Sequence, residues 1–339
     1  MEFQHTPVLL KETVEGLNIQ PDGIYVDGTL GGGGHSLEIV KRLTTGRLIG
    51  IDQDECAIQK ASEILSEYSD KVCLVKGNYR NIKKILKNLN IQHIDGALLD
   101  IGVSSYQFDE GERGFSFHED AILDMRMDQS MEKNAKDIVN SYTLGELTEI
   151  FWKYGEENWG KRIAEFIVEE RRRKPIKTTL ELVDIIKKAI PKRKRQEAHP
   201  ARKVFQALRI EVNDELNALR DGLYGFVDVL QPKGRLAIIT FHSLEDRIVK
   251  QSFKDLARDC ICPADFPICV CNHRAKIEIV NTKPIVAGEK ELRENQRSRS
   301  AKLRIAQRKQ RENYHDTRYI FTRTMDSREK CTEGQIEKS

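Results

Sequence analysis

A loop with five glycines follows a short apolar run near the start of the chain. The run Ile24-Tyr25-Val26 ends in Asp27, the loop spans 28–34, and an amphipathic stretch covers 37–43. Glycine is used where the backbone needs φ > 0 or must approach a ligand closely. This order predicts a strand, a tight turn and a helix, which is how a Rossmann-type nucleotide-binding unit begins.

A second apolar run ends in an acid at a spacing typical of nucleoside sites. Residues 48–51 are followed by Asp52, which lies 24 residues after Gly28. An acid at the tip of the second strand can accept hydrogen bonds from both hydroxyls of a ribose. The two motifs together predict a nucleoside site, and a glycine-rich turn without a ligand is the alternative.

The glycine spacing separates two classes of nucleoside. Dinucleotide enzymes carry G-x-G-x-x-G, with the pyrophosphate at a helix N-terminus. Here the pattern reads Gly31-x-Gly33-x-x-Ser36, so the third glycine is missing. Asp27 is expected at the mouth of the loop, where it would repel a diphosphate and attract a cation. We therefore expect S-adenosylmethionine as the cofactor and consider NAD the less favoured alternative.

Strands and helices alternate as far as residue 100. Helices are expected over 54–66 and 82–89, a short buried strand over 72–75, and another strand over 94–99. Strands joined by helices form a parallel sheet, and ligands bind beyond the carboxyl ends of its strands. Four polar side chains are expected at that edge: Asp27, Asp52, Tyr79 and Asp100.

The pattern changes after Gln107, where helices are expected without intervening strands. Capping boxes open two of them, Thr143 with Glu146 and Thr178 with Glu181. The sheet then resumes, with helices expected over 204–219 and 226–230, a turn over 231–234, a strand over 235–241 and a helix over 245–257.

The predicted fold class is α/β: a Rossmann-like domain with a mostly parallel sheet, plus an inserted all-helical domain. The first domain is discontinuous and comprises 1–107 and 211–308, and the insert comprises 108–210. Residues 309–339 are polar, lack apolar periodicity and are expected to form a disordered tail.

The positive charge is concentrated in two blocks, although the net charge of the chain is only +3. Residues 171–209 hold 14 Lys and Arg against 3 Asp and Glu, and residues 290–311 hold 9 against 2. A run of charge is most often a solvated face. Two such blocks in one protein make a polyanion such as RNA the expected partner.

Several separate blocks of this sequence resemble the RsmH (MraW) family of methyltransferases. The similarity covers nearly all of residues 1–308, and so many blocks in the same order make it highly specific. The matching blocks are His5–Leu9, Gly33–Ser36, Gly50–Asp52, Asp100–Gln107, Arg113–Phe117, Leu123–Asp128, His199–Arg202, Arg209–Asn213, Thr240–Arg247 and Arg299–Arg304.

The resemblance implies a Rossmann-like class I methyltransferase that uses S-adenosylmethionine. It implies methylation of the exocyclic N4 of a decoding-centre cytosine in 16S ribosomal RNA. It also implies that the inserted helical domain recognises RNA. The residues it assigns to the cofactor are Gly33, Gly34, His35, Asp52, Tyr79, Asp100 and Gln107.

The sequence offers one candidate for the catalytic group. An acceptor for the N4 hydrogens would stabilise charge developing on the amine, and Asp100 is the candidate. Many amino-methyltransferases carry D-P-P-Y here, whereas this chain has Asp100-Ile101-Gly102-Val103. A structural role for Asp100 as a strand-end cap is therefore the alternative.

Aromatic and histidine residues complete the candidates. Phe115 and Phe117 could stack on a base that has left its helix, or could pack inward. His199 and His242 precede charged helices and are expected to be capping or core residues, so neither is given a catalytic role.

Four cysteines form a C-x-C-x₆-C-x-C group: Cys260, Cys262, Cys269 and Cys271. Four thiolates could bind zinc, although C-x-C is tighter than the usual spacing of structural zinc sites. Free thiols and two labile disulfides are the alternatives. No metal site is therefore assigned from the sequence.

Two other functions remain open: methylation of a different RNA position, and an RNA-binding ribosome-assembly factor. The expected partner is 16S ribosomal RNA or the small ribosomal subunit, and a homodimer is possible. No apolar run reaches the length of a membrane helix, and the first residues lack the pattern of a secretory signal. With seven cysteines, this predicts a cytoplasmic protein with reduced thiols and no membrane partner.

Overall fold

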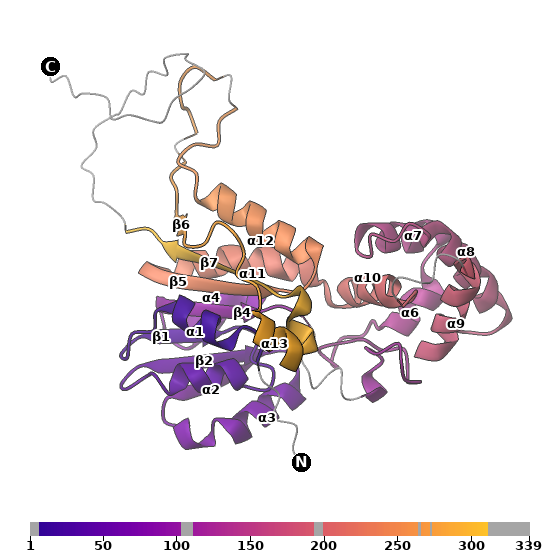
Figure 1. Ribbon diagram of the computed structural model, residues 1–339, viewed down its shortest axis with the longest axis horizontal. Coiled ribbons are helices and arrows are strands. Elements are labelled where there is room, and N and C mark those ends of the chain that lie inside the picture. Colours follow the sequence, from indigo (N-terminus) through magenta and orange to yellow (C-terminus); the bar gives the residue numbers. More distant parts are fainter. Residues whose placement is uncertain (1–6, 103–110, 193–198, 264–265, 272, 311–339) are drawn as a thin grey trace.

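A seven-stranded sheet forms the centre of the molecule (Figure 1). The structure is a computed structural model that describes residues 7–102, 111–192, 199–263, 266–271 and 273–310. The strand order is β3-β2-β1-β4-β5-β7-β6. The strands are β1 Ile24–Asp27, β2 Arg47–Asp52, β3 Val72–Lys76, β4 Ile94–Asp100, β5 Leu230–Thr240, β6 Ile277–Ile279 and β7 Lys302–Arg308.

The first five strands are parallel, and β7 is antiparallel to both β5 and β6. The predicted fold class, an α/β protein with a mostly parallel sheet, is confirmed. The register pairs Asp27 with Gly50 on one side and with Leu98 on the other. The carboxyl ends of β1, β2 and β4 therefore meet at one edge of the sheet.

Helices cover both faces of the sheet. The side chains of Val26, Ile49 and Leu99 pack into one cluster with α4, α11 and α12. Those of Tyr25 and Leu48 pack into another cluster on the opposite face, with α1, α2 and α3. The helices of these two layers are α1 Leu10–Leu17, α2 Gly34–Val40, α3 Glu55–Ile64, α4 Ile82–Asn88, α11 Glu215–Val229 and α12 Ser243–Leu256.

A third cluster of apolar side chains belongs to the helices between β4 and α11. Figure 1 shows these helices extending to one side of the sheet. Both predicted capping boxes, at Thr143 and at Thr178, are present. The boundaries proposed for an inserted domain stay a prediction. The helices are α6 Ala135–Ser141, α7 Leu144–Lys153, α8 Gly160–Arg173, α9 Thr179–Ala189 and α10 Arg202–Asn213.

Shorter elements complete the described chain. They are the helix α13 Glu289–Glu294 and the 3-10 helices η1 Ser66–Tyr68, η2 Tyr79–Asn81, η3 Gly111–Arg113 and η5 Gln296–Ser300. Among the described residues, no helix is long and apolar enough to cross a membrane. The tail predicted over 309–339 lies almost entirely outside the described residues, which end at 310.

Four predictions about individual elements were wrong, including the separate helix expected over 226–230, whose residues belong to α11 and to the start of β5. The helix expected over 204–219 ends at Asn213, because Asp214 takes the left-handed conformation (φ 51°) that Asp tolerates, and α11 then continues unbroken to Val229. The turn expected over 231–234 lies inside β5, at an irregularity where Lys233 has φ 71°. β3 is half-exposed rather than buried because it is an edge strand.

Candidate active site

Three carboxyl groups lie at the carboxyl ends of three neighbouring strands. Asp27 ends β1, Asp52 ends β2 and Asp100 ends β4, as predicted. The glycine loop connects β1 to α2 beside them. Each of the three groups has a raised pKa, and burial is the largest cause in every case. This edge of the sheet therefore disfavours negative charge unless a cation or several hydrogen-bond donors compensate it.

Asp27 is buried, and this corrects the prediction that it stands open at the mouth of the loop. Its side chain is 1% exposed, and one oxygen accepts a hydrogen bond from Ser36 Oγ at 2.8 Å. The other oxygen accepts from the backbone N–H of Thr29 at 3.2 Å. Burial raises the pKa of Asp27 to about 6, although the Ser36 bond acts in the opposite direction. Ser36, which replaces the third glycine of a dinucleotide motif, thus holds Asp27 beneath the loop.

Asp52 organises the turn between β1 and α2 and the start of α3. Its Oδ2 accepts a hydrogen bond from Gly31 N at 2.8 Å, and its Oδ1 accepts from Asp54 N at 2.9 Å. Burial raises its pKa to about 6 despite these bonds. Each carboxylate oxygen has a second lone pair, so the group can still accept hydrogen bonds from a ligand.

Asp100 has the least satisfied carboxyl group of the three. Its Oδ1 is buried and has no hydrogen-bond partner among the described residues. Its Oδ2 lies 3.7 Å from His35 Nδ1. Burial, together with repulsion from Asp27 and Glu245, raises its pKa to about 8. A buried carboxyl oxygen without a partner is costly and marks a position where a ligand can supply the missing donor or charge.

His35 lies on the first turn of α2 and is also buried. Its Nε2 is 3.0 Å from the carbonyl oxygen of Val8, which can only accept, so Nε2 carries the proton. Burial lowers the pKa of His35 to about 4. The ring is therefore neutral near pH 7, and it does not offset the charge of Asp100.

Two glycines of the loop are required by the backbone. Gly33 precedes α2 with φ 77°, a conformation that residues with a side chain rarely adopt. A Cβ at Gly34 would come within 2.4 Å of the Pro7 ring. The loop is therefore pressed against the N-terminal segment on one side, while Asp52 holds it on the other.

Tyr79 begins the short helix η2, just beyond the end of β3. Its ring lies against α11 at Gly222, where a Cβ would approach it to 2.6 Å. Burial raises the pKa of its hydroxyl. A hollow of about 460 Å³ lies next to it, at the ends of β2 and β3. The lining residues are Gln53, Lys76, Gly77, Asn78, Arg80, Asp128, Met131, Asn213 and Asp214.

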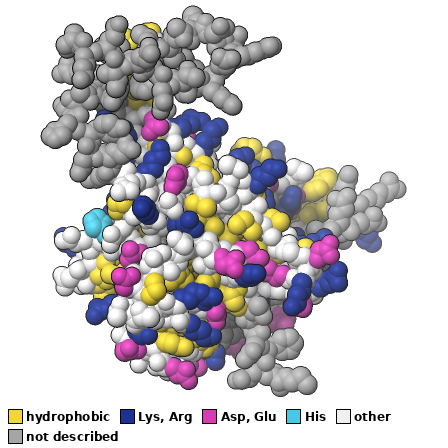
Figure 2. All heavy atoms as spheres, turned by 60° about the vertical axis from the view of Figure 1, so that its left-hand side comes forward, with side chains coloured by type: hydrophobic (Ala, Val, Ile, Leu, Met, Phe, Trp, Pro, Cys, Tyr) yellow, Lys and Arg dark blue, Asp and Glu magenta, His cyan; other side chains and the backbone are white. Residues whose placement is uncertain are grey.

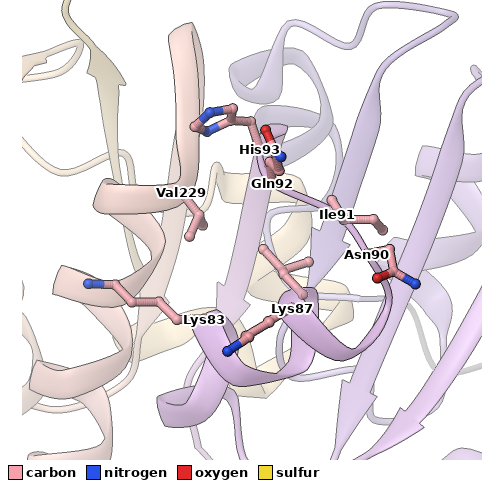
Figure 3. Close-up of a pocket in the computed structure, with 8 residues that line it drawn as sticks. Lys83, Lys87, Asn90, Ile91, Gln92, His93 and Val229 are labelled. Carbon is pink, nitrogen blue, oxygen red and sulfur yellow. The ribbon is translucent and has the colours of Figure 1, made fainter.

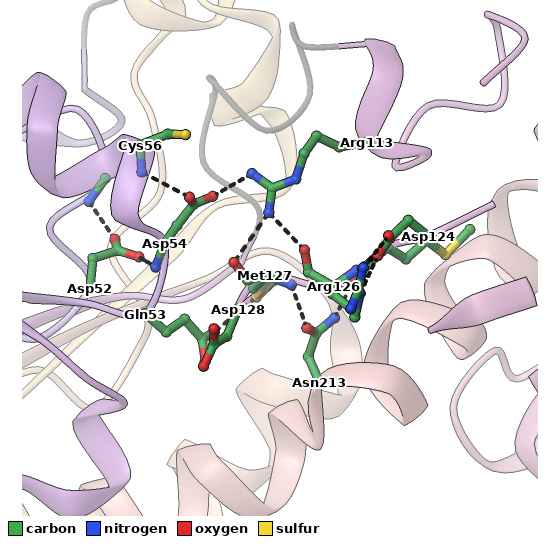
Figure 4. A network of polar contacts seen from close by, with 12 residues as sticks. Asp52, Gln53, Asp54, Cys56, Arg113, Asp124, Arg126, Met127, Asp128 and Asn213 are labelled. Carbon is green, nitrogen blue, oxygen red and sulfur yellow. Dashed lines mark hydrogen bonds and ion pairs between the residues drawn. The ribbon is translucent and has the colours of Figure 1, made fainter. Parts of the chain in front are cut away.

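A buried ion pair joins this edge of the sheet to the segment that precedes α6 (Figure 4). Arg113 Nη1 lies 2.7 Å from Asp54 Oδ2, and both side chains are less than 10% exposed. Arg113 Nη2 also donates to the carbonyl oxygens of Arg126 and Met127. Asn213 holds the same segment from the other side, because it accepts from Met127 N and donates to the carbonyl of residue 125.

Sequence reasoning missed three residues of this site. Thr29 Oγ accepts a hydrogen bond from Asp100 N at 2.6 Å and so fixes the end of β4. Ser36 holds Asp27, as described above. Glu245 of α12 is fully buried and repels the Asp100 carboxylate. The resemblance had singled out the block that contains Glu245, but only the fold brings it near Asp100.

Other predicted residues are placed as follows. Phe115 is buried in the helical cluster, which agrees with the inward-packing alternative and not with stacking on a base. Phe117 is half-buried and stacks on His199, with ring centroids 4.5 Å apart. His242 caps α12, which agrees with the role expected for it. Gln107 lies outside the described residues.

Three residues at the start of the first basic block have partners within the protein. Arg171 donates to the carbonyl oxygen of Val139, Arg173 pairs with Glu169, and Lys174 pairs with Glu181. Residues 192–195 are a run of four basic residues in the same block. Of these, the structure describes only Lys192, which is exposed. Figure 2 shows another face, with the left-hand side of Figure 1 forward, and there Lys and Arg side chains are interspersed with Asp and Glu.

The second basic block also has structural roles. Arg304 is 7% exposed and lies 2.7 Å from Asp246, and Lys302 pairs with the same carboxylate. Both lie on β7, inside the sheet. Arg299 is exposed.

A hollow that is larger than the one next to Tyr79 is remote from this site. It measures about 600 Å³ and lies where α4 ends and β4 begins, at the opposite edge of the sheet (Figure 3). Lys83, Lys87, His93 and Val229 are among its lining residues. Size alone therefore does not identify the site, whereas the three carboxyl groups with raised pKa values do.

Comparison with known proteins gives matches along the whole described chain. The model of the MraW methylase family matches residues 2–309. The ribosomal RNA small subunit methyltransferase H of Finegoldia magna is 54% identical over 310 residues, which are 91% of this chain and 99% of that protein. The protein of the same name from Clostridioides difficile is 56% identical over 310 residues, 91% of this chain and 100% of that protein.

Solved structures show a weaker likeness. The crystal structure of an rRNA methylase from Streptococcus thermophilus superposes with a TM-score of 0.39 and 12% identity, covering 89% of this chain and 94% of that one.

Proposed function

Because the chain belongs to the MraW methylase family, we propose that it transfers a methyl group from S-adenosylmethionine to the exocyclic N4 of a decoding-centre cytosine in 16S ribosomal RNA. The chain is a methyltransferase of that family, and relatives above 50% identity carry the name of small-subunit ribosomal RNA methyltransferases. The observation that carries the proposal is the group of three carboxyls at the glycine loop, each with a pKa raised mainly by desolvation.

This group of carboxyls fits the proposed cofactor. S-adenosylmethionine supplies an electrophilic methyl group on a positively charged sulfur. A site with three carboxyls of raised pKa gains most from a cationic ligand, because the added charge stabilises the ionised forms. The buried Oδ1 of Asp100, which has no partner among the described residues, supports a ligand at that position in particular.

We assign the cofactor to seven residues. The backbone of the glycine loop would receive the carboxylate of the methionine part, Asp52 the ribose and Tyr79 the adenine. Asp100 would face the other end of the ligand. The full set is Gly33, Gly34, His35, Asp52, Tyr79, Asp100 and Gln107, of which Gln107 lies outside the described residues.

Asp100 is also our candidate for the group that orients the target amine. The N4 amine is a poor nucleophile because its lone pair is delocalised into the ring. A carboxylate that accepts one of its hydrogens stabilises positive charge developing on nitrogen. Since the pKa of Asp100 is about 8 without a ligand, this role requires that a nearby positive charge keep the group ionised.

The proposed substrate and setting follow from the family. The substrate would be either free 16S ribosomal RNA or the small ribosomal subunit. The helices α6 to α10 would contact the RNA. Work on ribosomal RNA implies a cytoplasmic location. A homodimer is also a proposal, and the contacts described above do not test it.

The reaction is tested with small subunits from cells that lack this protein. Purified enzyme and S-adenosylmethionine should add one methyl group, found by mass spectrometry of the digested RNA as N4-methylcytidine. We expect Asp100→Asn to lose turnover more than cofactor affinity, since its contribution grows in the transition state. Asp70→Asn, an exposed acid next to β3, is the matched control and should behave as the wild type.

Each other outcome selects a different function. A methylated nucleoside other than N4-methylcytidine would point to another RNA position. RNA binding with no methyl transfer under any condition would point to an assembly factor. An Asp100→Asn enzyme with normal turnover at saturating cofactor would remove Asp100 from the chemistry.

A further inference from the structure

The segment between α12 and β6 projects away from the body of the molecule (Figure 1). Residues 257–276 contain neither helix nor strand in their described part. The two ends are tied together, because Lys276 N donates to the carbonyl oxygen of Leu256 and Ala275 N donates to Asp259 Oδ1. The segment is thus a long loop whose two ends lie side by side.

In its described part, this segment has no apolar core to hold it. Its apolar side chains Ile261, Phe266, Ile268 and Val270 are between 44% and 66% exposed, so they form no core. A loop of this length without secondary structure is uncommon in a folded domain. Small segments that lack a core are usually held by disulfides or by a metal ion.

Four thiols meet at the base of this loop. The Sγ atoms of Cys260, Cys262, Cys269 and Cys271 all lie within 4.8 Å of one another. Cys271 Sγ is 3.5 Å from Cys269 Sγ and 3.8 Å from Cys260 Sγ. Two C-x-C pairs that are separated by six residues in the sequence are therefore brought to one point.

We propose that these four cysteines form a mononuclear tetrathiolate site for Zn²⁺. Zinc bound to four thiolates is tetrahedral, with Zn–S distances of about 2.3 Å, which places the sulfurs about 3.8 Å apart. The two Sγ–Sγ separations of 3.5 Å and 3.8 Å are close to that spacing. The inference does not depend on the proposed methyl transfer.

The donor set and its surroundings agree with this metal. Soft thiolate ligands select zinc over Mg²⁺ and Ca²⁺, which require oxygen ligands. The backbone N–H of Cys262 donates to Cys260 Sγ at 3.4 Å, a contact that stabilises a thiolate. A single ion would join both C-x-C pairs, so its binding free energy would hold the loop closed.

Disulfides explain the geometry less well. A disulfide needs an S–S distance of about 2.05 Å, whereas the Sγ atoms here are 3.5 Å and 3.8 Å apart. All four of these cysteines are free in the structure. Two disulfides would also need no common meeting point, yet the four sulfurs share one.

The test measures metal in the full chain, purified under reducing conditions without chelator from cells grown with zinc. Elemental mass spectrometry should find one zinc per chain in the wild type. The double variant Cys269→Ser, Cys271→Ser should hold less than a tenth of that amount. Cys73→Ser is the matched control, because Cys73 is exposed on the edge strand β3, and it should keep the full zinc content.

Two further measurements keep the proposal falsifiable if the double variant folds poorly. Cobalt replacing zinc in the wild type should give the thiolate charge-transfer absorption of a tetrahedral site. Removal of the zinc by a chelator should make the peptide bonds within residues 257–276 more sensitive to protease than those in the rest of the chain. A wild type without zinc that takes up no cobalt would overturn the proposal, as would intact disulfides among the four cysteines or iron as the resident metal.

Discussion

At the scale of single residues, the raised pKa of Asp100 makes the stability of the fold depend on pH. Folding raises its pKa to about 8, mainly by burial, so the folded protein binds a proton that the unfolded chain has already released. An acid of this kind stabilises the fold below its unfolded pKa, near 4, and loses that contribution as pH rises through its folded pKa. Asp27 and Asp52, each with a pKa of about 6, act in the same direction at lower pH.

We therefore predict that the ligand-free protein loses stability as pH rises from about 4 to 8. Between pH 6 and pH 8, Asp100 contributes most of the three, with an upper limit of about 1.4 kcal/mol per pH unit. Urea unfolding of the wild type and of Asp100→Asn measures this directly. The variant should show a flatter profile above pH 6, and Asp70→Asn should not. Parallel profiles for wild type and Asp100→Asn would mean that Asp100 is ionised throughout.

Residue spacing predicted part of this site and could not predict the rest. The positions of Asp52 and Asp100 follow from strand ends, which an apolar run followed by an acid reveals. The burial of Asp27 could not be seen, because it depends on how Ser36 turns back onto β1. Glu245 lies far away in sequence, so its effect on Asp100 required the fold.

At the scale of elements, the ion pair between Arg113 and Asp54 connects the start of α3 to the segment before α6. Breaking a buried pair leaves an uncompensated charge, which costs about 3–5 kcal/mol. We expect Arg113→Met to lower the free energy of unfolding by that order, measured by urea denaturation. The double variant Arg113→Met, Asp54→Asn should lose less, since no buried charge is then left unpaired.

The matched control is Arg247→Met, which breaks the exposed pair between Arg247 and Glu156. Exposed pairs contribute about 0–1 kcal/mol, so this variant should remain close to the wild type. Equal losses for Arg113→Met and Arg247→Met would mean that the buried pair does not hold the two elements together.

Element boundaries were the weakest part of sequence reasoning. A regular apolar pattern runs through 204–219, and it does not reveal that Asp214 breaks the helix there. The strands β6 and β7 were not predicted, because β6 has only three residues and β7 interleaves Lys302, Arg304 and Arg308 with apolar positions. Part of the charge that suggested an RNA-binding block over 290–311 is instead neutralised within the protein, where Asp246 pairs with Lys302 and Arg304.

At the scale of the whole molecule, the strand order limits which variants can test whether the second basic block binds RNA. β7 lies between β5 and β6, so removing the chain after Asn295 would take an inner strand out of the sheet. Truncation there would test folding and not RNA binding. Point substitutions at exposed positions are needed instead, with Arg299 and Lys309 available in the second basic block.

We predict that the block 192–195 supplies phosphate contacts of its own, because three residues of the neighbouring block 171–174 already have partners within the protein. Replacing residues 192–195 by Ser should weaken RNA binding and flatten its salt dependence by about 0.7 per lost contact, with cofactor affinity unchanged. Binding measured over a range of salt concentrations gives the slope. The control replaces Lys83, Lys84, Lys87 and Lys233, four exposed lysines at the opposite edge of the sheet, and should leave the slope unaltered. If the slope changes only in the double variant Arg299→Ser, Lys309→Ser, the second basic block contacts the RNA instead.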